Sequence, residues 1–352
     1  MLNKLISSLP SKVDGVLIVS EVNRRYFTAF NSSDGILLAT KKGSVFLTDS
    51  RYIEEAQNTV KCCDVTEIRK VSEQLPELCR QFGVKTLMVE SDRLTVSQLK
   101  AYRKILKGVL LTTVNTDKLI DNLREVKSEY EKESVIKAQR IAEKAYDHIL
   151  GFIREGVTEK EVALELDFFM LKNGAEAISF ETIAISGANT SKPHGVPTDK
   201  KICSGDFVTL DYGAVVNGYH SDMTRTIAVG DVSDEQIKVY NTVLEAQLKA
   251  LSVLKEGVKC SDADAAARDY IKEKGYGEYF RHSTGHGVGI EIHEKPNLSP
   301  KNDKILQCGN IVTVEPGIYI PGKFGVRIED MAIITKNSCV NLTKIPKELA
   351  KI

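Results

Sequence analysis

A two-residue turn in the middle of the chain fixes the geometry of one β-hairpin. Asn217-Gly218 stands between apolar segments, where this dipeptide is a strong signal for a tight turn. With these residues at the turn, Val216 pairs with Tyr219, and that pair sets the register of both strands. The sequence therefore predicts two antiparallel strands, near 206–212 and 219–229, whose cross-strand neighbours are all defined.

This register brings two aspartates to the same face of the hairpin. Asp211 lies opposite Thr224, and Asp222 lies opposite Gly213. The two aspartates are then diagonal neighbours, with Cβ atoms on the order of 6–8 Å apart. Carboxylates this close repel each other unless cations lie between them. We expect a cation site here, with Gly213 leaving open space for the ion; two solvent-facing aspartates are the alternative.

The histidines are unevenly distributed along the chain. There are six, and three of them fall within twelve residues: His282, His286 and His293. Glycines on both sides of His286 argue against a regular helix and leave room for a ligand. An offset of seven residues does not place His286 and His293 on one face of an ideal strand, so we expect a bend between them.

Two glutamates stand in apolar strand contexts. Glu315 ends the run Ile311–Val314, and Glu329 lies in a predicted strand over 325–335. A glutamate in such a place is costly to bury without a partner. The alternatives are a strand end that reaches solvent at Glu315 and an ion pair of Glu329 with Arg327, two residues away on the same face.

Four carboxylates and one imidazole make a hard, oxygen-rich set of ligands. Four negative charges balance two divalent cations, and the set suits Mn²⁺ or Co²⁺, with Zn²⁺ or Fe²⁺ as further candidates. Because the set has no thiolate, a structural zinc site is not expected. Two such ions share a water, lower its pKa and deliver hydroxide to a carbonyl or phosphoryl group.

The remainder of the chain divides into two patterns. A length of 352 residues suggests about two domains. Up to about residue 116, strands alternate with helices, which is typical of an α/β domain; after residue 150, helices and antiparallel strands segregate as in an α+β domain. The boundary falls in a charged stretch near 116–126, which gives predicted domains of residues 1–122 and 123–352. The other predicted strands are 15–19, 35–39, 44–47, 86–89 and 180–185, and the predicted helices are 51–59, 70–82, 158–173, 233–256 and 260–274.

Composition excludes several classes of protein. Lys plus Arg and Asp plus Glu both number 48, and no basic stripe stands out, which argues against a nucleic-acid partner. No apolar run approaches the roughly 18 residues of a membrane helix, so no membrane partner is expected. Seven scattered cysteines without CxxC spacing predict reduced thiols, and the first residues make a poor signal peptide. We therefore expect a cytoplasmic protein.

Taken together, these motifs resemble the metallopeptidases of the methionine aminopeptidase, prolidase and aminopeptidase P group, which have the pita-bread fold. The segments that carry the resemblance are Pro193–Gly195, Asp211–Gly213, Ser221–Arg225, Gly285–Gly289, His293-Glu294, Val314–Tyr319 and Arg327–Asp330. Two further segments, Asn23–Phe30 and Thr48–Tyr52, are similar to the N-terminal domain of creatinases and proline peptidases, which methionine aminopeptidases lack. The resemblance implies a creatinase-like α/β N-terminal domain and an α+β pita-bread catalytic domain.

The resemblance also implies a dinuclear metal centre. Asp211 would chelate one metal, and His286 with Glu315 would hold the other. Asp222 and Glu329 would bridge the two ions. A bridging hydroxide would attack the carbonyl of an Xaa–Pro bond, and Glu315 would carry the proton to the leaving nitrogen.

Further catalytic residues follow from the same resemblance. His194 and His293 would hydrogen-bond the substrate carbonyl and the tetrahedral intermediate. His282 and Arg327 would also line the site, and Arg327 would support the bridging acid or the substrate, with Tyr319 as a weaker correspondence. Family members are commonly homodimers, so we expect a homodimer that acts on proline-containing peptides.

The sequence favours an Xaa-Pro aminopeptidase over an Xaa-Pro dipeptidase. Some prolidases have an arginine shortly after the His-Glu-x-Pro segment, whereas this chain has Asn297. A dipeptidase must bind the C-terminal carboxylate, usually through a basic residue, so the asparagine favours the aminopeptidase. A creatinase uses no metal, and a binding module of this fold would be catalytically inactive; the complete set of five ligands argues against both.

Overall fold

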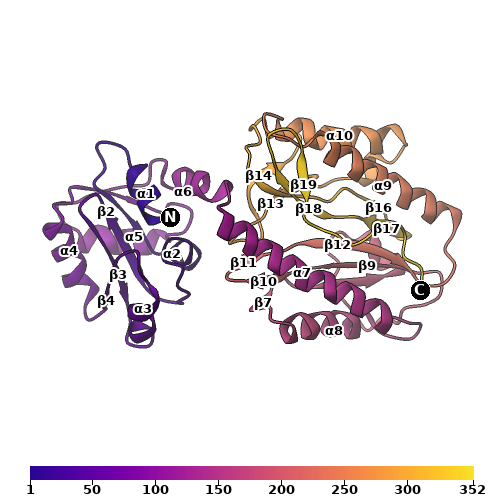
Figure 1. Cartoon of the computed structure of the whole chain (residues 1–352), viewed down its shortest axis with the longest axis horizontal. Helices are drawn as coiled ribbons and strands as arrows, with labels where there is room; N and C mark the ends of the chain where they lie inside the picture. Colours follow the sequence, from indigo (N-terminus) through magenta and orange to yellow (C-terminus); the bar gives the residue numbers. More distant parts are fainter. The chain divides into compact units, whose positions relative to one another are not determined.

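The computed structural model describes all 352 residues, which form two compact units, Met1–Leu123 and Arg124–Ile352. Each unit has its own sheets and its own helices (Figure 1). None of the helices combines the length and the apolar character that a membrane span needs.

The first unit is built on one mixed sheet of six strands in the order β4-β3-β2-β1-β5-β6. Its strands are β1 (Gly15–Ile18), β2 (Ile36–Thr40), β3 (Gly43–Thr48), β4 (Asp64–Glu67), β5 (Thr86–Val89) and β6 (Leu110–Thr112). Its helices are α1 (Leu2–Ser7), α2 (Glu21–Thr28), α3 (Ile53–Thr59), α4 (Val71–Gln81) and α5 (Val96–Ile105), while α6 (Thr116–Glu125) reaches the boundary. The predicted α/β class is confirmed. The sequence did not predict the edge strands β4 and β6, which are short, and β4 is polar and mostly exposed.

Helices cover the sheet of the first unit. β1 and β2 are buried at every position, as expected of strands that are covered on both faces. On one face, Leu75 and Cys79 of α4 join a core with Leu17, Leu38 and Leu87 of the sheet. Each such leucine contributes roughly 1.5–3 kcal/mol through its burial.

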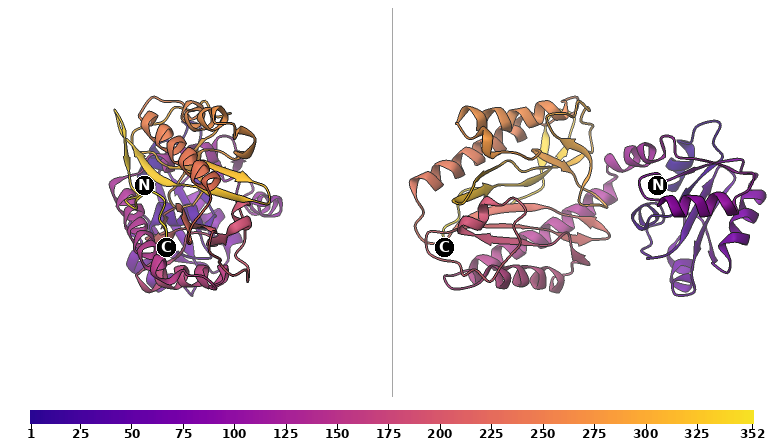
Figure 2. Two further views of the ribbon diagram at one scale, coloured as in Figure 1. Left: turned by 90° about the vertical axis from the view of Figure 1, so that its right-hand side faces the viewer. Right: turned by 180° about the vertical axis from the view of Figure 1, so that it is seen from behind.

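The second unit places its strands between two pairs of helices (Figures 1 and 2). Its helices are α7 (Glu129–Phe152), α8 (Glu159–Lys172), α9 (Asp234–Val253) and α10 (Cys260–Glu273), with short 3-10 turns at Gly187–Ser191 and Gly277–Tyr279. Its strands are β7 (Ala177–Ile178), β8 (Ile183–Ser186), β9 (Phe207–Tyr212), β10 (Ala214–Val216), β11 (Tyr219–His220), β12 (Met223–Ala228), β13 (Gly285–Gly287), β14 (Glu294–Leu298), β15 (Ile311–Val314), β16 (Gly317–Ile320), β17 (Phe324–Arg327), β18 (Asp330–Ile334) and β19 (Cys339–Asn341). α7 and α8 pack on β9 and β12, whereas α9 and α10 pack on β15 to β18. The predicted α+β class is confirmed.

The central hairpin has the predicted register. Val216 pairs with Tyr219, and Asp211 pairs with Thr224. Asn217 and Gly218 both have positive φ, 53° and 80°, as a type I′ turn requires. The turn therefore sets which face of β9 and β12 carries the acidic residues.

Gly213 serves a different purpose from the one that the sequence suggested. A Cβ atom at this position would lie 1.9 Å from the carbonyl oxygen of Ser221. The prediction of open space for an ion is thus wrong. The glycine instead allows the backbones of the two hairpin strands to approach closely at a point between Asp211 and Asp222. Gly285, beside His286, is similar, since its Cβ would lie 1.9 Å from the carbonyl oxygen of Thr313.

Substitution of Gly213 by alanine is expected to destabilise the protein by about 3 kcal/mol, because the added methyl forces the hairpin backbone to move. Gly151 offers a matched control in α7, where a Cβ meets nothing within 4 Å. Gly151→Ala is expected to be neutral or to stabilise by up to about 1 kcal/mol. Urea denaturation of both variants checks this pair, and equal stability of the two would contradict the close approach.

The predicted strand over 325–335 is interrupted. β17 ends at Arg327 and β18 begins at Asp330. Between them, the amide of Glu329 donates to the carbonyl oxygen of Thr224 at 3.1 Å. The guanidinium of Arg225 donates to the carbonyl oxygen of Glu329 at 2.6 Å. The chain therefore changes sheets at Ile328-Glu329 and turns Glu329 toward the hairpin.

Candidate metal centre

All nine predicted site residues line one cavity of about 580 Å³ in the second unit. Five are the predicted metal ligands: Asp211, Asp222, His286, Glu315 and Glu329. The other four are the predicted catalytic residues His194, His282, His293 and Arg327. The cavity therefore brings together segments that are far apart in the sequence.

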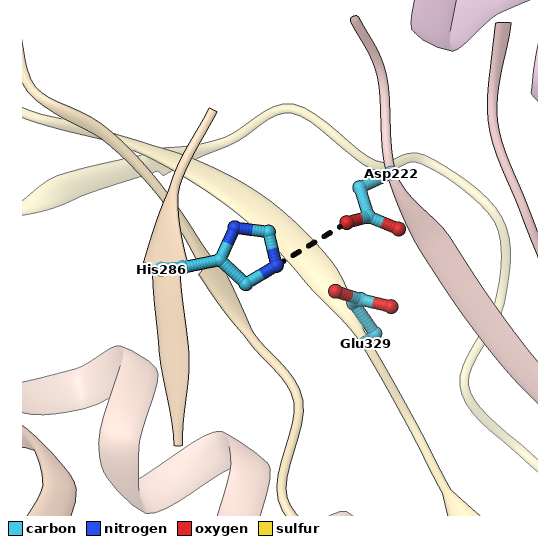
Figure 3. Close-up of side chains that lie close together, drawn as sticks. All are labelled: Asp222, His286 and Glu329. Carbon is cyan, nitrogen blue, oxygen red and sulfur yellow. Dashed lines mark ion pairs between the residues drawn. The ribbon is translucent and has the colours of Figure 1, made fainter. Parts of the chain in front are cut away.

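Three of the predicted ligands form the tightest cluster (Figure 3). One ligand atom each of Asp222, His286 and Glu329 lies within 4.8 Å of the others. Asp222 precedes β12, His286 lies on β13 and Glu329 lies between β17 and β18. Nε2 of His286 is 3.5 Å from Oδ2 of Asp222. Side chains from three separate parts of the second unit thus converge on one point.

Asp211 and Glu315 extend this cluster. Oε1 of Glu315 is 3.5 Å from Nε2 of His286. Asp211 lies on β9, and its Oδ2 accepts a hydrogen bond from the guanidinium of Arg327. Glu315 follows β15 and is partly buried, so the alternative of a strand end that reaches open solvent does not hold. The structure leaves it facing the cavity.

The donor atoms of the cluster fit divalent cations. Oδ1 of Asp211 and Oε1 of Glu329 are buried without any hydrogen-bond partner, which is costly unless a cation neutralises them. Nδ1 of His286 lies 3.1 Å from the carbonyl oxygen of Gly287. When the imidazole is neutral, Nδ1 donates to this carbonyl and Nε2 presents its lone pair to the carboxylates. Carboxylate oxygens and one imidazole nitrogen are ligands that Mn²⁺, Co²⁺ and Zn²⁺ accept.

Four of the five predicted ligands have a raised pKa when no metal is bound. Burial raises the pKa of Asp222 to about 6 and that of Glu315 to about 7. Burial and the charge of Asp222 raise the pKa of Glu329 well above its usual value. Burial alone would lower the pKa of His286, but its hydrogen bond to Asp222 and the charge of Glu315 raise it to about 9. As pH falls, these four groups take up protons that a metal must displace.

Metal affinity is therefore expected to rise steeply with pH. Between pH 5 and pH 9 Asp222, Glu315 and His286 lose the protons that compete with the metal, so binding at pH 6 should be at least about tenfold weaker than at pH 8. Calorimetric titration with Mn²⁺ in buffers of different ionisation enthalpy measures both the affinity and the protons released. Binding that releases no protons at pH 6 would contradict these raised pKa values.

Arg327 connects two of the predicted ligands without an ion pair to Glu329. Its Nε donates to Oγ1 of Thr224 at 3.1 Å, and Thr224 in turn donates to Oε2 of Glu329 at 2.7 Å. The alternative of a direct Arg327–Glu329 pair is wrong, because the chain turns at Ile328 and directs the arginine to Asp211 instead. The sequence did not predict that Thr224 connects these side chains, although the predicted register had placed it opposite Asp211.

His282 is held from both ring nitrogens. Nδ1 lies 2.8 Å from the carbonyl oxygen of Ser283, and Nε2 lies 2.9 Å from the hydroxyl of Tyr319. Burial and the charge of Arg327 lower the pKa of His282 to about 4, so the ring is neutral. The Tyr319 hydroxyl donates to Nε2 of the neutral His282 ring and accepts from Arg327 at 2.8 Å, so Tyr319 connects His282 to Arg327.

The remaining two histidines face the cavity from separate segments. His293 follows the expected bend after β13, and its ring centre is 4.4 Å from that of His286. Burial and the charge of His286 lower the pKa of His293. His194 is exposed on the loop after β8. Both residues line the cavity that holds the acidic cluster.

Buried carboxylates and an imidazole that converge on a cavity in this way are typical of metal-dependent hydrolases. Residues 133–336 match metallopeptidase family M24, and residues 5–126 match the creatinase/prolidase N-terminal domain. The chain belongs to metallopeptidase family M24. The predicted family and the predicted enzyme class, a metallo-exopeptidase, are confirmed, and divalent metal ions follow from the family.

Similar proteins match the chain over nearly its whole length. An Xaa-Pro dipeptidase from Pyrococcus furiosus is 39% identical over 355 residues, which cover 99% of each chain. The structure of an Xaa-Pro dipeptidase from Bacillus anthracis has a TM-score of 0.95 and 44% identity, covering 100% of this chain and 99% of that one. The structure of an X-Pro aminopeptidase from Thermotoga maritima has a TM-score of 0.94 and 35% identity, with the same coverage.

Proposed function

We propose that this protein is an Xaa-Pro dipeptidase, a prolidase, that works with two divalent metal ions. The observation that carries the proposal is the convergence of Asp222, His286 and Glu329 in a chain that is 39–44% identical to Xaa-Pro dipeptidases along its length. The sequence analysis favoured an aminopeptidase because of Asn297. The dipeptidase relatives favour the dipeptidase instead, since the similar aminopeptidase is less identical, at 35%.

The five acidic and imidazole ligands would hold the metals. Asp211 would hold one ion, His286 and Glu315 the other, and Asp222 and Glu329 would bridge them, a role that the unpartnered Oε1 of Glu329 supports. When bound, two divalent ions lower the pKa of a water and polarise a carbonyl oxygen. The Arg327–Thr224–Glu329 chain of hydrogen bonds would keep these carboxylates in place.

The other residues would bind substrate and move protons. His194 and His293 would donate hydrogen bonds to the developing oxyanion of the scissile carbonyl, which their place on the cavity wall allows. Glu315 would take a proton from water and pass it to the leaving proline nitrogen. The proline nitrogen of an Xaa–Pro bond carries no hydrogen. A small cavity of this kind therefore needs no hydrogen-bond acceptor opposite that nitrogen.

Parallel assays on an Xaa-Pro dipeptide and an Xaa-Pro-Yaa tripeptide test this function. We expect the Mn²⁺- or Co²⁺-loaded protein to cleave the dipeptide at least about tenfold faster than the tripeptide, expressed as kcat/KM. Equal cleavage of the tripeptide would overturn the dipeptidase in favour of the aminopeptidase. Cleavage of neither peptide, with metals bound, would support a binding module.

Several narrower statements about this protein stay predictions. These are the domain limits 1–122 and 123–352, the use of Mn²⁺ or Co²⁺, the homodimer and the cytoplasmic location.

A further inference from the structure

One wall of the cavity is a loop whose two ends meet at a single carboxylate. The loop runs from Ser186, the last residue of β8, to Thr198. Its residues Pro193 to Pro197, including His194, all line the cavity. Glu159, the first residue of α8, lies beneath the loop and is 1% exposed.

Glu159 accepts hydrogen bonds from both ends of the loop. Its Oε1 accepts from the amide of Ser186 at 2.7 Å and from Nδ2 of Asn189 at 3.0 Å. Its Oε2 accepts from the amide of Thr198 at 3.0 Å and from the Thr198 hydroxyl at 2.6 Å. These donors carry no charge, and none of them is a predicted metal ligand. The carboxylate therefore works as an acceptor that closes the loop.

The opposite side of the loop rests on β17. The amide of Gly325 donates to Oγ1 of Thr190 at 2.8 Å, and a Cβ on Gly325 would lie 2.2 Å from the carbonyl oxygen of Thr190. Further along, the guanidinium of Arg327 donates to the carbonyl oxygen of Pro193 at 3.2 Å. The segment before His194 is thus fixed between Glu159 on one side and the strand of Arg327 on the other.

We propose that Glu159 is a positioning residue for substrate binding, which acts by holding the loop that carries His194. This inference rests on the proposed peptidase function. A carboxylate suits the place because both of its oxygens accept, and the loop presents only donors to it. Glutamine has the same size but would turn an NH₂ group toward the backbone amide of Ser186 or Thr198, and would leave that amide without its acceptor.

The test combines hydrogen exchange with a double-mutant cycle. We expect Glu159→Gln to speed amide exchange over residues 187–198 by about tenfold or more, with metal content unchanged. It should lower kcat/KM for Xaa-Pro by about 10- to 100-fold, but by less than about threefold when His194→Ala is already present. Glu161→Gln is the matched control, because Glu161 is on the same helix and bonds only its own cap residue, Thr158.

Two results would overturn the proposal. One is unchanged exchange of the loop in Glu159→Gln; the other is an equal loss of kcat/KM with and without His194, which would indicate general damage. If Glu159→Gln does not fold, Glu159→Asp, with a shorter side chain but the same acceptors, takes its place in both measurements. If the wild-type protein cleaves no Xaa-Pro peptide, the proposed function fails, while loop exchange still decides whether Glu159 holds the loop.

Discussion

Glu329→Gln is expected to lose metal and activity while its metal-free form becomes more stable. Glutamine keeps the size of the side chain but removes a charge that metals need, so metal affinity should fall at least about 100-fold and activity about 1000-fold. In the metal-free protein, burial and the charge of Asp222 raise the pKa of Glu329. An acid with a raised folded-state pKa destabilises the fold as pH rises above its unfolded value of 4.5. The gain for glutamine should therefore be about 1 kcal/mol or more at pH 7 and absent below pH 4.

The neighbouring aspartate provides the matched control for this variant. Asp330 is also buried, but it pairs with Arg225 at 2.8 Å and Lys347 at 2.6 Å. Asp330→Asn should therefore destabilise the metal-free protein, because it leaves buried cations without a partner. Urea denaturation at pH 7 compares both variants. Equal destabilisation of both would mean that Glu329 is a structural carboxylate and not a metal ligand.

Glu294→Gln is expected to cost about 3–5 kcal/mol of stability at pH 7. Oε1 of Glu294 is 2.6 Å from the guanidinium of Arg124, and Oε2 is 3.0 Å from Nζ of Lys127. All three side chains are almost fully buried. Removal of the carboxylate charge leaves the buried Arg124 and Lys127 with too little negative charge around them. These side chains lie beside the segment that carries His293.

This loss should depend on pH in a defined direction. Burial alone would raise the pKa of Glu294, but Lys127 and Arg124 lower it to about 2. A lowered pKa contributes stability above the unfolded value of 4.5, and that stability is lost as pH falls from 4.5 toward 2. The difference in unfolding free energy between wild type and Glu294→Gln should thus become smaller as pH falls through this range. Glu129→Gln, which removes an exposed pair with Lys132, should change stability by less than about 1 kcal/mol at any pH and serves as the control.

Local rules were enough to predict the hairpin but not its surroundings. The Asn217-Gly218 turn defined the pairing of Asp211 with Thr224, because register follows from turn geometry alone. The break at Ile328-Glu329 could not be read in the same way. It depends on hydrogen bonds to Thr224 and Arg225, about a hundred residues earlier in the chain. β13 was missed as well, because its glycines have low strand propensity and gain their place by close approach to other backbone segments, Gly285 to Thr313 and Gly287 to Lys295.

The candidate site likewise combines residues that the sequence predicted with contacts that it did not predict. Its residue types and spacing resembled a known family, so the sequence named nine residues that the structure places in one cavity. The connections among them include contacts between segments that are far apart in the sequence, Thr224 with Glu329 and Tyr319 with His282. Asn297 shows that one residue is not enough to choose between two substrate classes. It lines the cavity, as expected, and it favoured the aminopeptidase, whereas the relatives favour a dipeptidase.

Titration of the metal-free protein with Mn²⁺ or Co²⁺, while hydrolysis of an Xaa-Pro dipeptide is followed, tests the metal-dependent peptidase most directly. We expect no activity without metal, and activity that rises with added metal and saturates at about two equivalents per chain. Full activity in the thoroughly stripped protein would contradict a role of the acidic cluster in catalysis. So would binding of two equivalents without any cleavage.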